Sequence, residues 1–285
     1  MTQFNQTQWL WRSSRIPLAC IGLICAQLAS GQDTTNRFSF DDYLVAPVRV
    51  HLLIAKESPT VGTTLLESDI TRILGKLNWV WAQAGLHFSL ESLVREDAIE
   101  TAETRAGLLE PSQLLGLRPT GSIASNMFHI YYIKAMSMNG IYFPEAIFVK
   151  DTSSLRSVPG GIDEPLPRVT SHELGHAFGL PHRQDTTNLM ASGTTGTWLN
   201  EEEIKQAREA ARKCVWIEPA GDLMKRANTL FRTNQKQAAA VLYSRLAKIP
   251  VNDRRVELAK KRASEAIQPD SAVNRKPRMD TNGHE

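Results

Sequence analysis

The chain has 285 residues, of which 42% are hydrophobic and 22% charged, and its formal net charge is +3. This composition is ordinary for a globular protein and excludes a wholly disordered chain, and the length allows one or two domains. The charge is unevenly distributed, because residues 223–285 hold 14 Lys or Arg against 6 Asp or Glu. Residues 31–222 carry a net charge of −7, so an acidic body precedes a basic C-terminal region.

The first 31 residues have the pattern of a secretory signal. Arg12 and Arg15 precede the apolar run Ile16–Ala29, and small residues follow it. The run is shorter than the about 20 apolar residues of a membrane-spanning helix, although an uncleaved anchor is the alternative. We therefore predict a secreted or periplasmic (extracytoplasmic) protein with a signal peptide at 1–31 and no stable membrane span after cleavage.

Removal of this signal also removes two of the three cysteines. Cys20 and Cys25 lie within the apolar run, which leaves Cys214 alone in the mature chain and allows no intramolecular disulfide. Packing and metal binding must then stabilise the fold. Residues 32–44 are predicted to be a short linker.

Segments in which apolar and polar residues alternate, or which are rich in β-branched and aromatic residues, predict a sheet with one long helix packed on it. A helix capped by Ser68 and ended by Gly85 has its apolar residues on one face, and we expect Trp79 and Trp81 to pack in the core. His51, His87 and His129 fall on strands without the spacing of metal ligands, so we interpret them as ordinary packed or exposed residues. The predicted strands are Val48–Ile54, Leu86–Leu90 and Met127–Ile133.

The segment 139–149 predicts two short strands that flank Pro144, which is tolerated at a sheet edge. The loop that follows contains three oxygen donors near glycines, Asp151, Asp163 and Glu164. The segment lacks a complete calcium-loop pattern, so we favour a solvated loop and keep a structural Ca²⁺ as the alternative.

The sequence HELGHAFGLPH, His172 to His182, carries the chemistry. On a helix, His172 and His176 lie one turn apart on the same face, where two imidazoles can bind one ion. Gly179 can end the helix in a left-handed conformation and turn the chain so that His182 becomes a third ligand. Three protein ligands and one open position describe a catalytic zinc site, and Glu173 is placed to act on a water there.

This motif resembles the zinc-binding sequence of the metzincin clan of metallopeptidases. The resemblance implies a tight turn with a methionine beneath the zinc, and Met190 matches that position. Some branches carry a Tyr two residues later, where this chain has Ser192, so no such Tyr is assigned. The clan also implies an edge strand that pairs with extended substrate, and sequence order gives that role to four residues, Gly140, Ile141, Tyr142 and Phe143.

The resemblance implies an α/β (α+β, metzincin-like) domain over residues 45–218. Its fold would be a twisted, mostly parallel sheet with an antiparallel edge strand, an active-site helix and a C-terminal helix. The segment Leu199–Lys213 suits that last helix, since Asn200 can cap it and its charges complement the helix dipole.

A small all-α extension is predicted over residues 219–268. Its apolar and small residues resemble one tetratricopeptide-type hairpin, and a helical pair docked on the catalytic domain is an equal alternative. It could bind a protein partner, whereas no motif indicates nucleic-acid binding. Residues 269–285 are polar and predicted to be disordered.

These features predict a secreted endopeptidase with one catalytic Zn²⁺, in which Glu173 is the general base for hydrolysis of an extended peptide or protein substrate. One alternative is a catalytically weak, metzincin-like binding protein that acts through its helical C-terminal region. Another is a peptidase restricted to a single partner or to short peptides.

Overall fold

The computed structural model describes residues 37–107 and 109–267. The predicted signal at 1–31 and the predicted disordered tail at 269–285 lie outside the described residues. No helix within the described ranges is both long and apolar enough to cross a membrane.

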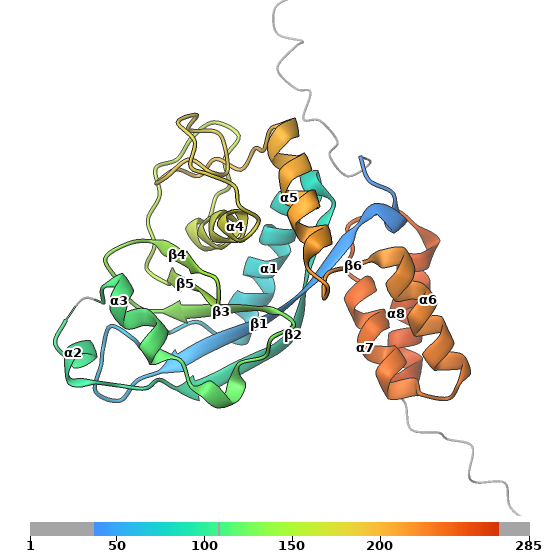
Figure 1. The fold of residues 1–285 in the computed structure, drawn as a ribbon, viewed down its shortest axis with the longest axis horizontal. Coiled ribbons are helices and arrows are strands. Elements are labelled where there is room, and N and C mark those ends of the chain that lie inside the picture. The colour runs from blue at the N-terminus through green and yellow to red at the C-terminus, as the bar shows by residue number, and fades with distance from the viewer. Residues whose placement is uncertain (1–36, 108, 268–285) are drawn as a thin grey trace, which may run out of the picture. The chain divides into compact units, whose positions relative to one another are not determined.

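Six strands form one sheet, in which the order is β2-β1-β3-β5-β4 and β6 pairs with the start of β1 (Figure 1). All neighbours along this order are parallel except β4, which runs antiparallel to β5 at the edge. The predicted fold class, a mostly parallel sheet with an antiparallel edge strand, is therefore confirmed. The strands are β1 Leu44–Ile54, β2 Leu86–Asp97, β3 Phe128–Ile133, β4 Gly140–Phe143, β5 Ala146–Lys150 and β6 Glu218–Pro219.

The three long helices α1, α4 and α5 pack against one face of this sheet, where a single apolar core joins them to the strands (Figure 1). Alternate residues of β1, Val48, Val50 and Leu52, point into this core because successive side chains of a strand face opposite sides. The helices of this region are α1 Glu67–Trp81, α2 Ala102–Arg105, α3 Pro111–Leu114, α4 Pro165–Ala177 and α5 Glu201–Lys213.

Two expectations for α1 are wrong. Trp81 is fully buried but Trp79 is 56% exposed, because residues two apart on a helix point in nearly opposite directions. The helix begins at Glu67, so Ser68 lies inside it; instead, the carboxylate of Asp69 accepts the N–H of Leu66 at 2.9 Å. At the start of α5, the Asn200 side chain does accept the N–H of Glu203.

The C-terminal helices build a second core on the first residues of the sheet. They are α6 Ala220–Arg232, α7 Lys236–Leu246 and α8 Arg254–Ile267. Phe40 and Tyr43, from the segment predicted to be a linker, are buried in this core. Two ion pairs, Arg245 to Glu91 and Arg255 to Asp41, add polar contacts to the packing. The domain boundaries themselves stay a prediction.

Candidate metal centre

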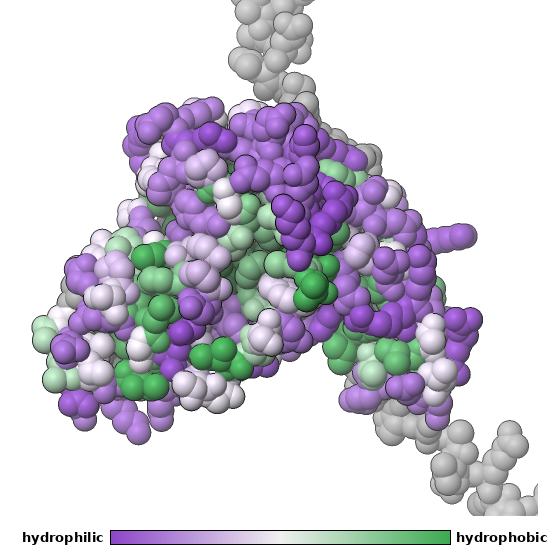
Figure 2. Space-filling model, in the orientation of Figure 1, coloured by the Kyte–Doolittle hydropathy of each residue, from purple (hydrophilic) through white to green (hydrophobic). Residues whose placement is uncertain are grey.

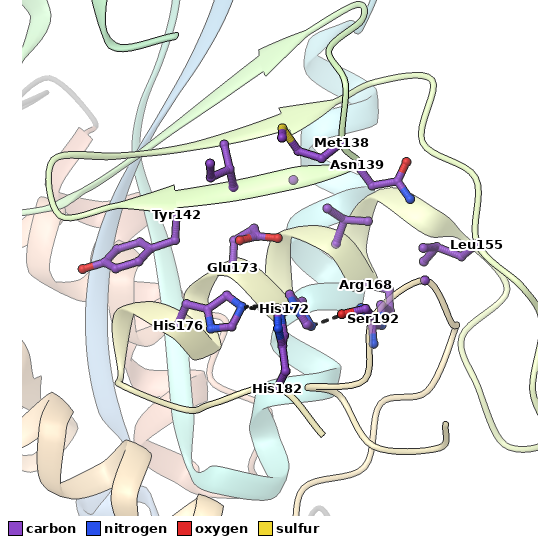
Figure 3. A pocket seen from close by; sticks show the side chains of 14 residues that line it. Met138, Asn139, Tyr142, Leu155, Arg168, His172, Glu173, His176, His182 and Ser192 are labelled. Atoms are coloured by element: carbon purple, nitrogen blue, oxygen red, sulfur yellow. Dashed lines mark hydrogen bonds between the residues drawn. The ribbon is translucent and has the colours of Figure 1, made fainter. Parts of the chain in front are cut away.

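The helix α4 places two of the predicted ligands on the inner side of a cleft. Pro165 occupies the first turn of the helix, where its missing N–H costs no hydrogen bond. One turn separates His172, which is 6% exposed, from the half-buried His176. Both rings point from α4 towards the loop that carries His182 (Figure 3).

The chain reverses after α4 through a pair of backbone hydrogen bonds. Leu180 donates its N–H to the Gly175 carbonyl and Gly179 donates to the His176 carbonyl, both at 2.9 Å. This is the Schellman arrangement, in which the residue after the helix cap is left-handed, and Gly179 has φ of 78°. The reversal brings His182 back to the two helical histidines.

The three imidazoles converge through their Nε2 atoms. Nε2 of His176 lies 3.2 Å from Nε2 of His172 and 3.1 Å from Nε2 of His182. Nitrogens bound tetrahedrally to zinc at about 2.0–2.1 Å are separated by about 3.3 Å. The donor set and its spacing therefore fit a zinc ion, and among residues 37–107 and 109–267 these three form the one cluster able to hold a metal.

Backbone carbonyls orient two of the ligand rings. Nδ1 of His172 lies 2.8 Å from the Leu189 carbonyl oxygen, and Nδ1 of His176 lies 2.9 Å from that of Leu180. Each Nδ1 carries the proton and donates it, which leaves the Nε2 lone pair directed at the centre. Burial, aided by the neighbouring Arg168, lowers the pKa of His172 to about 3, so this ring is neutral.

Glu173 lies between the histidines and β4, with its carboxylate facing the strand (Figure 3). Burial raises the pKa of this carboxyl to about 8, while Arg168 and the N–H of Tyr142 oppose the shift. Gly140 allows the approach of the strand, because a Cβ there would lie 2.6 Å from Glu173 Oε1. A cation held by the three imidazoles would favour the ionised carboxylate, which is the form that accepts a proton.

Met190 is fully buried and lies against α4. The turn that holds it is closed by Asn188, whose Oδ1 accepts the Met190 N–H at 2.6 Å. The Met190 carbonyl also accepts the N–H of Arg183, next to His182, at 3.0 Å. The methionine turn and the segment of the third histidine are thus connected directly.

Glu203, on α5, anchors this connection, and the sequence analysis did not single it out. Its fully buried carboxylate accepts Arg183 Nε at 2.6 Å and Asn188 Nδ2 at 2.8 Å. The same carboxylate accepts the N–H of Asn200 at 2.9 Å. The Asn-x-x-Glu spacing at 200–203, a helix-capping pattern, is the signal that could have drawn attention to it.

A pocket of about 410 Å³ adjoins the histidines and lies between β4 and the loop after Met190. Lys150 donates to the Asn139 carbonyl, so the alternation of an antiparallel pair directs the N–H and C=O of Gly140 and Tyr142 away from β5. Their backbone groups therefore face the cleft, whereas those of Ile141 and Phe143 face β5. Figure 2 shows apolar residues in the hollow of this face, below hydrophilic loops.

The other candidate ligands lie away from this centre. Asp163 and Glu164 form ion pairs with Lys76 of α1, and Asp151 accepts the Thr63 hydroxyl at 2.8 Å. Oδ1 of Asp151 is buried without a hydrogen-bond partner, but the three carboxylates do not converge on a calcium site in the described ranges.

The three histidines on the strands, His51, His87 and His129, are packed inside the protein. His51 Nε2 lies 2.8 Å from Nδ1 of His129, and His51 Nδ1 lies 2.5 Å from Glu96. His87 is also buried, and its Nδ1 has no hydrogen-bond partner.

Comparison with known proteins adds little to this picture. No model of a protein family matches the chain, and no curated protein matches its sequence. A chain from the solved structure of a chaperone–substrate complex is 13% identical to this protein in sequence. The match has a TM-score of 0.40 and covers 61% of this chain and 35% of that chain. Metalloproteinase-II from Bacteroides fragilis is 14% identical, with a TM-score of 0.36 over 60% of this chain and 54% of its own. The chain thus spans about a third and about half of these two proteins, and both scores are too low to assign a family.

Proposed function

We propose that this protein is a zinc-dependent endopeptidase of the metzincin type. The observation that carries the proposal is the convergence of three imidazoles beside a buried carboxylate at an open cleft. A structural zinc site has four protein ligands, whereas three leave a position open for chemistry. Secretion through the signal at 1–31 stays a prediction within this proposal.

The residues of the cleft divide the work of peptide hydrolysis. His172, His176 and His182 would hold the zinc, which when bound polarises a carbonyl and lowers the pKa of water towards about 7. Glu173 accepts the proton of the attacking water and transfers it to the departing amine. Its burial favours the protonated form, which makes the carboxylate a stronger base than an exposed one.

The free edge of β4 is the proposed binding site for an extended substrate. Gly140 and Tyr142 direct backbone donors and acceptors into the cleft, and main-chain pairing binds a peptide with little dependence on its sequence. Ile141 and Phe143 would instead hold the strand on the sheet.

The test compares the chain without residues 1–31 with its Glu173→Gln variant on a quenched random-peptide pool. We expect cleavage by the parent that stops with chelator and returns with zinc, and a rate about 10²–10⁴-fold lower in the variant. Glu202→Gln, at an exposed glutamate on α5, is the matched control and should cleave like the parent. Equal cleavage by the parent and the Glu173 variant would refute the proposal.

A further inference from the structure

Arg168 is a buried cation in the wall of the proposed active site. It lies one turn before His172 on α4, is 2% exposed and lines the pocket beside the histidines. Figure 3 shows its side chain next to Ser192, on the Asn139 side of the cleft and away from Tyr142.

Most of the hydrogen-bonding capacity of Arg168 is unused. Its guanidinium has five N–H groups, of which one donates to the Gly196 carbonyl at 3.1 Å and one to the Ala191 carbonyl. Nη1 lies 3.3 Å from Nδ1 of His172, but that nitrogen already donates its proton to the Leu189 carbonyl and cannot accept another. Three N–H groups therefore have no acceptor within the described ranges.

The positive charge also lacks a counter-ion. No carboxylate in residues 37–107 and 109–267 forms an ion pair with Arg168, and the acidic group that influences it is Glu173. A guanidinium is not deprotonated in proteins, so Arg168 stays charged. A buried guanidinium without a partner is unfavourable, and a carboxylate entering the pocket would relieve this cost.

We propose that Arg168 selects substrates by binding an acidic side chain on the residue directly after the scissile bond. This proposal rests on the proposed peptidase function. The direction follows from β4, which runs from the Arg168 side of the cleft to the Tyr142 side (Figure 3). A substrate strand added antiparallel runs the other way, so its residues after the scissile bond lie beside Arg168.

The chemistry of the pocket suits such a side chain. A guanidinium presents parallel N–H donors that match the two oxygens of a carboxylate, and such charge-assisted bonds are stronger than neutral ones. The carbonyls of Gly196 and Ala191 already hold the guanidinium of Arg168 in place, which fixes the position of its free donors. An acidic substrate residue would complete a hydrogen-bond set that the protein itself leaves incomplete.

The test uses peptides based on the best-cleaved sequence and varied only after the scissile bond, with Asp, Asn, Glu or Gln. We expect kcat/KM for the acids to exceed that for the amides by about 10- to 100-fold in the parent. Arg168→Met should abolish this ratio, and Arg168→Lys should keep part of it because the charge remains. Arg212→Met, at an exposed arginine of α5, removes one charge elsewhere and should leave the ratio unchanged.

A purely structural role for Arg168 predicts a different result. Loss of its two carbonyl contacts would lower hydrolysis of acidic and amide peptides by the same factor, and that outcome would overturn the proposal. A parent enzyme without acid preference would overturn it as well. Zinc content and thermal unfolding of each variant show whether it is folded.

A binding measurement separates this proposal from the peptidase proposal. The zinc-loaded Glu173→Gln protein is titrated with fluorescein-labelled peptides that contain a central Asp or Asn. Tighter binding of the Asp peptide that disappears in the Glu173→Gln/Arg168→Met double variant supports acid selection even when no protein cleaves. Equal binding of the two peptides overturns it, even when cleavage is observed.

Discussion

The sulfur of Met190 occupies the space beside Gly175 in which a side chain would otherwise stand. A Cβ on Gly175 would lie 2.4 Å from Met190 Sδ, a distance that real contacts do not tolerate. The glycine between the two helical histidines thus permits the methionine turn to pack directly against α4.

Substitution of Gly175 by Ala should therefore disturb the centre. We expect the free energy of unfolding to fall by about 1–3 kcal/mol, as in overpacked cores, together with weaker zinc binding. Urea unfolding and zinc titration measure both effects. The matched control is Gly75→Ala in α1, where nothing lies within 4 Å of the added Cβ and where stability should rise by about 0.5–1 kcal/mol. Equal effects of the two substitutions would contradict the packing argument.

Glu203 connects α5 to the segments of the third histidine and of the methionine turn. Glu203→Gln removes the charge from its bonds to Arg183 and Asn188, and we expect a loss of about 2 kcal/mol in the free energy of unfolding. The partial exposure of Arg183 keeps the loss below that of a fully buried pair. Glu202→Gln should change stability by less than about 0.5 kcal/mol. A Glu203→Gln variant as stable as the parent would show that the charge of Glu203 in its bonds to Arg183 and Asn188 does not contribute to stability.

Gly140 permits the contact between β4 and the proposed base. In Gly140→Ala the new methyl group would lie 2.6 Å from both Glu173 Oε1 and Val169 Cγ1, so the carboxylate or the strand must move. Misplacement by about 1 Å can cost up to about 10²-fold in rate, and we expect kcat to fall by about 10- to 100-fold with zinc retained. Gly121→Ala, with open space around the Cβ, serves as the control. Unchanged kcat in Gly140→Ala would argue against this geometry.

The pH dependence of stability should report the buried His87. Burial, with a smaller effect of Lys248, lowers the pKa of His87 from 6.5 to about 4. Below pH 6.5 the unfolded chain binds a proton that the folded chain does not, so the free energy of unfolding falls as pH falls towards 4. The contribution is about 1.4 kcal/mol per pH unit.

The His87→Leu variant should lack this contribution. Between pH 6.5 and pH 5.0 we expect the parent to lose about 2 kcal/mol more than the variant in urea unfolding experiments. The leucine also removes a buried Nδ1 that has no partner, so the variant should fold well at neutral pH. Parallel pH profiles of the two proteins would contradict the buried, neutral state of His87.

The sequence predicted those parts of the fold whose signals are local. The alternation of β1 and the amphipathic pattern of α1 each depend on residues close in the chain. The edge position of β4 was instead implied by the metzincin resemblance, whereas Pro144 indicated only the break between β4 and β5. Trp79 was misplaced because apolarity alone does not set the direction of a side chain on a helix.

The surroundings of the proposed site could be predicted less well. The acceptors of the ligand rings are the backbone carbonyls of Leu180 and Leu189, and a carbonyl leaves no mark on residue type. The importance of Arg168 depends on which donors stay unpaired after folding, and only the structure shows this. Sequence motifs therefore indicated the residues of the proposed site, whereas their orientation required tertiary contacts.

Zinc binding tests the central claim most directly. Zinc stoichiometry and affinity should be measured for the parent, for His176→Gln and for His87→Leu, a buried histidine outside the cluster. We predict about one zinc per chain in the parent and in His87→Leu, and at least a 100-fold loss of affinity, on the order of 3 kcal/mol, in His176→Gln. A parent without zinc, or a His176→Gln variant that binds zinc as tightly as the parent, would contradict the account.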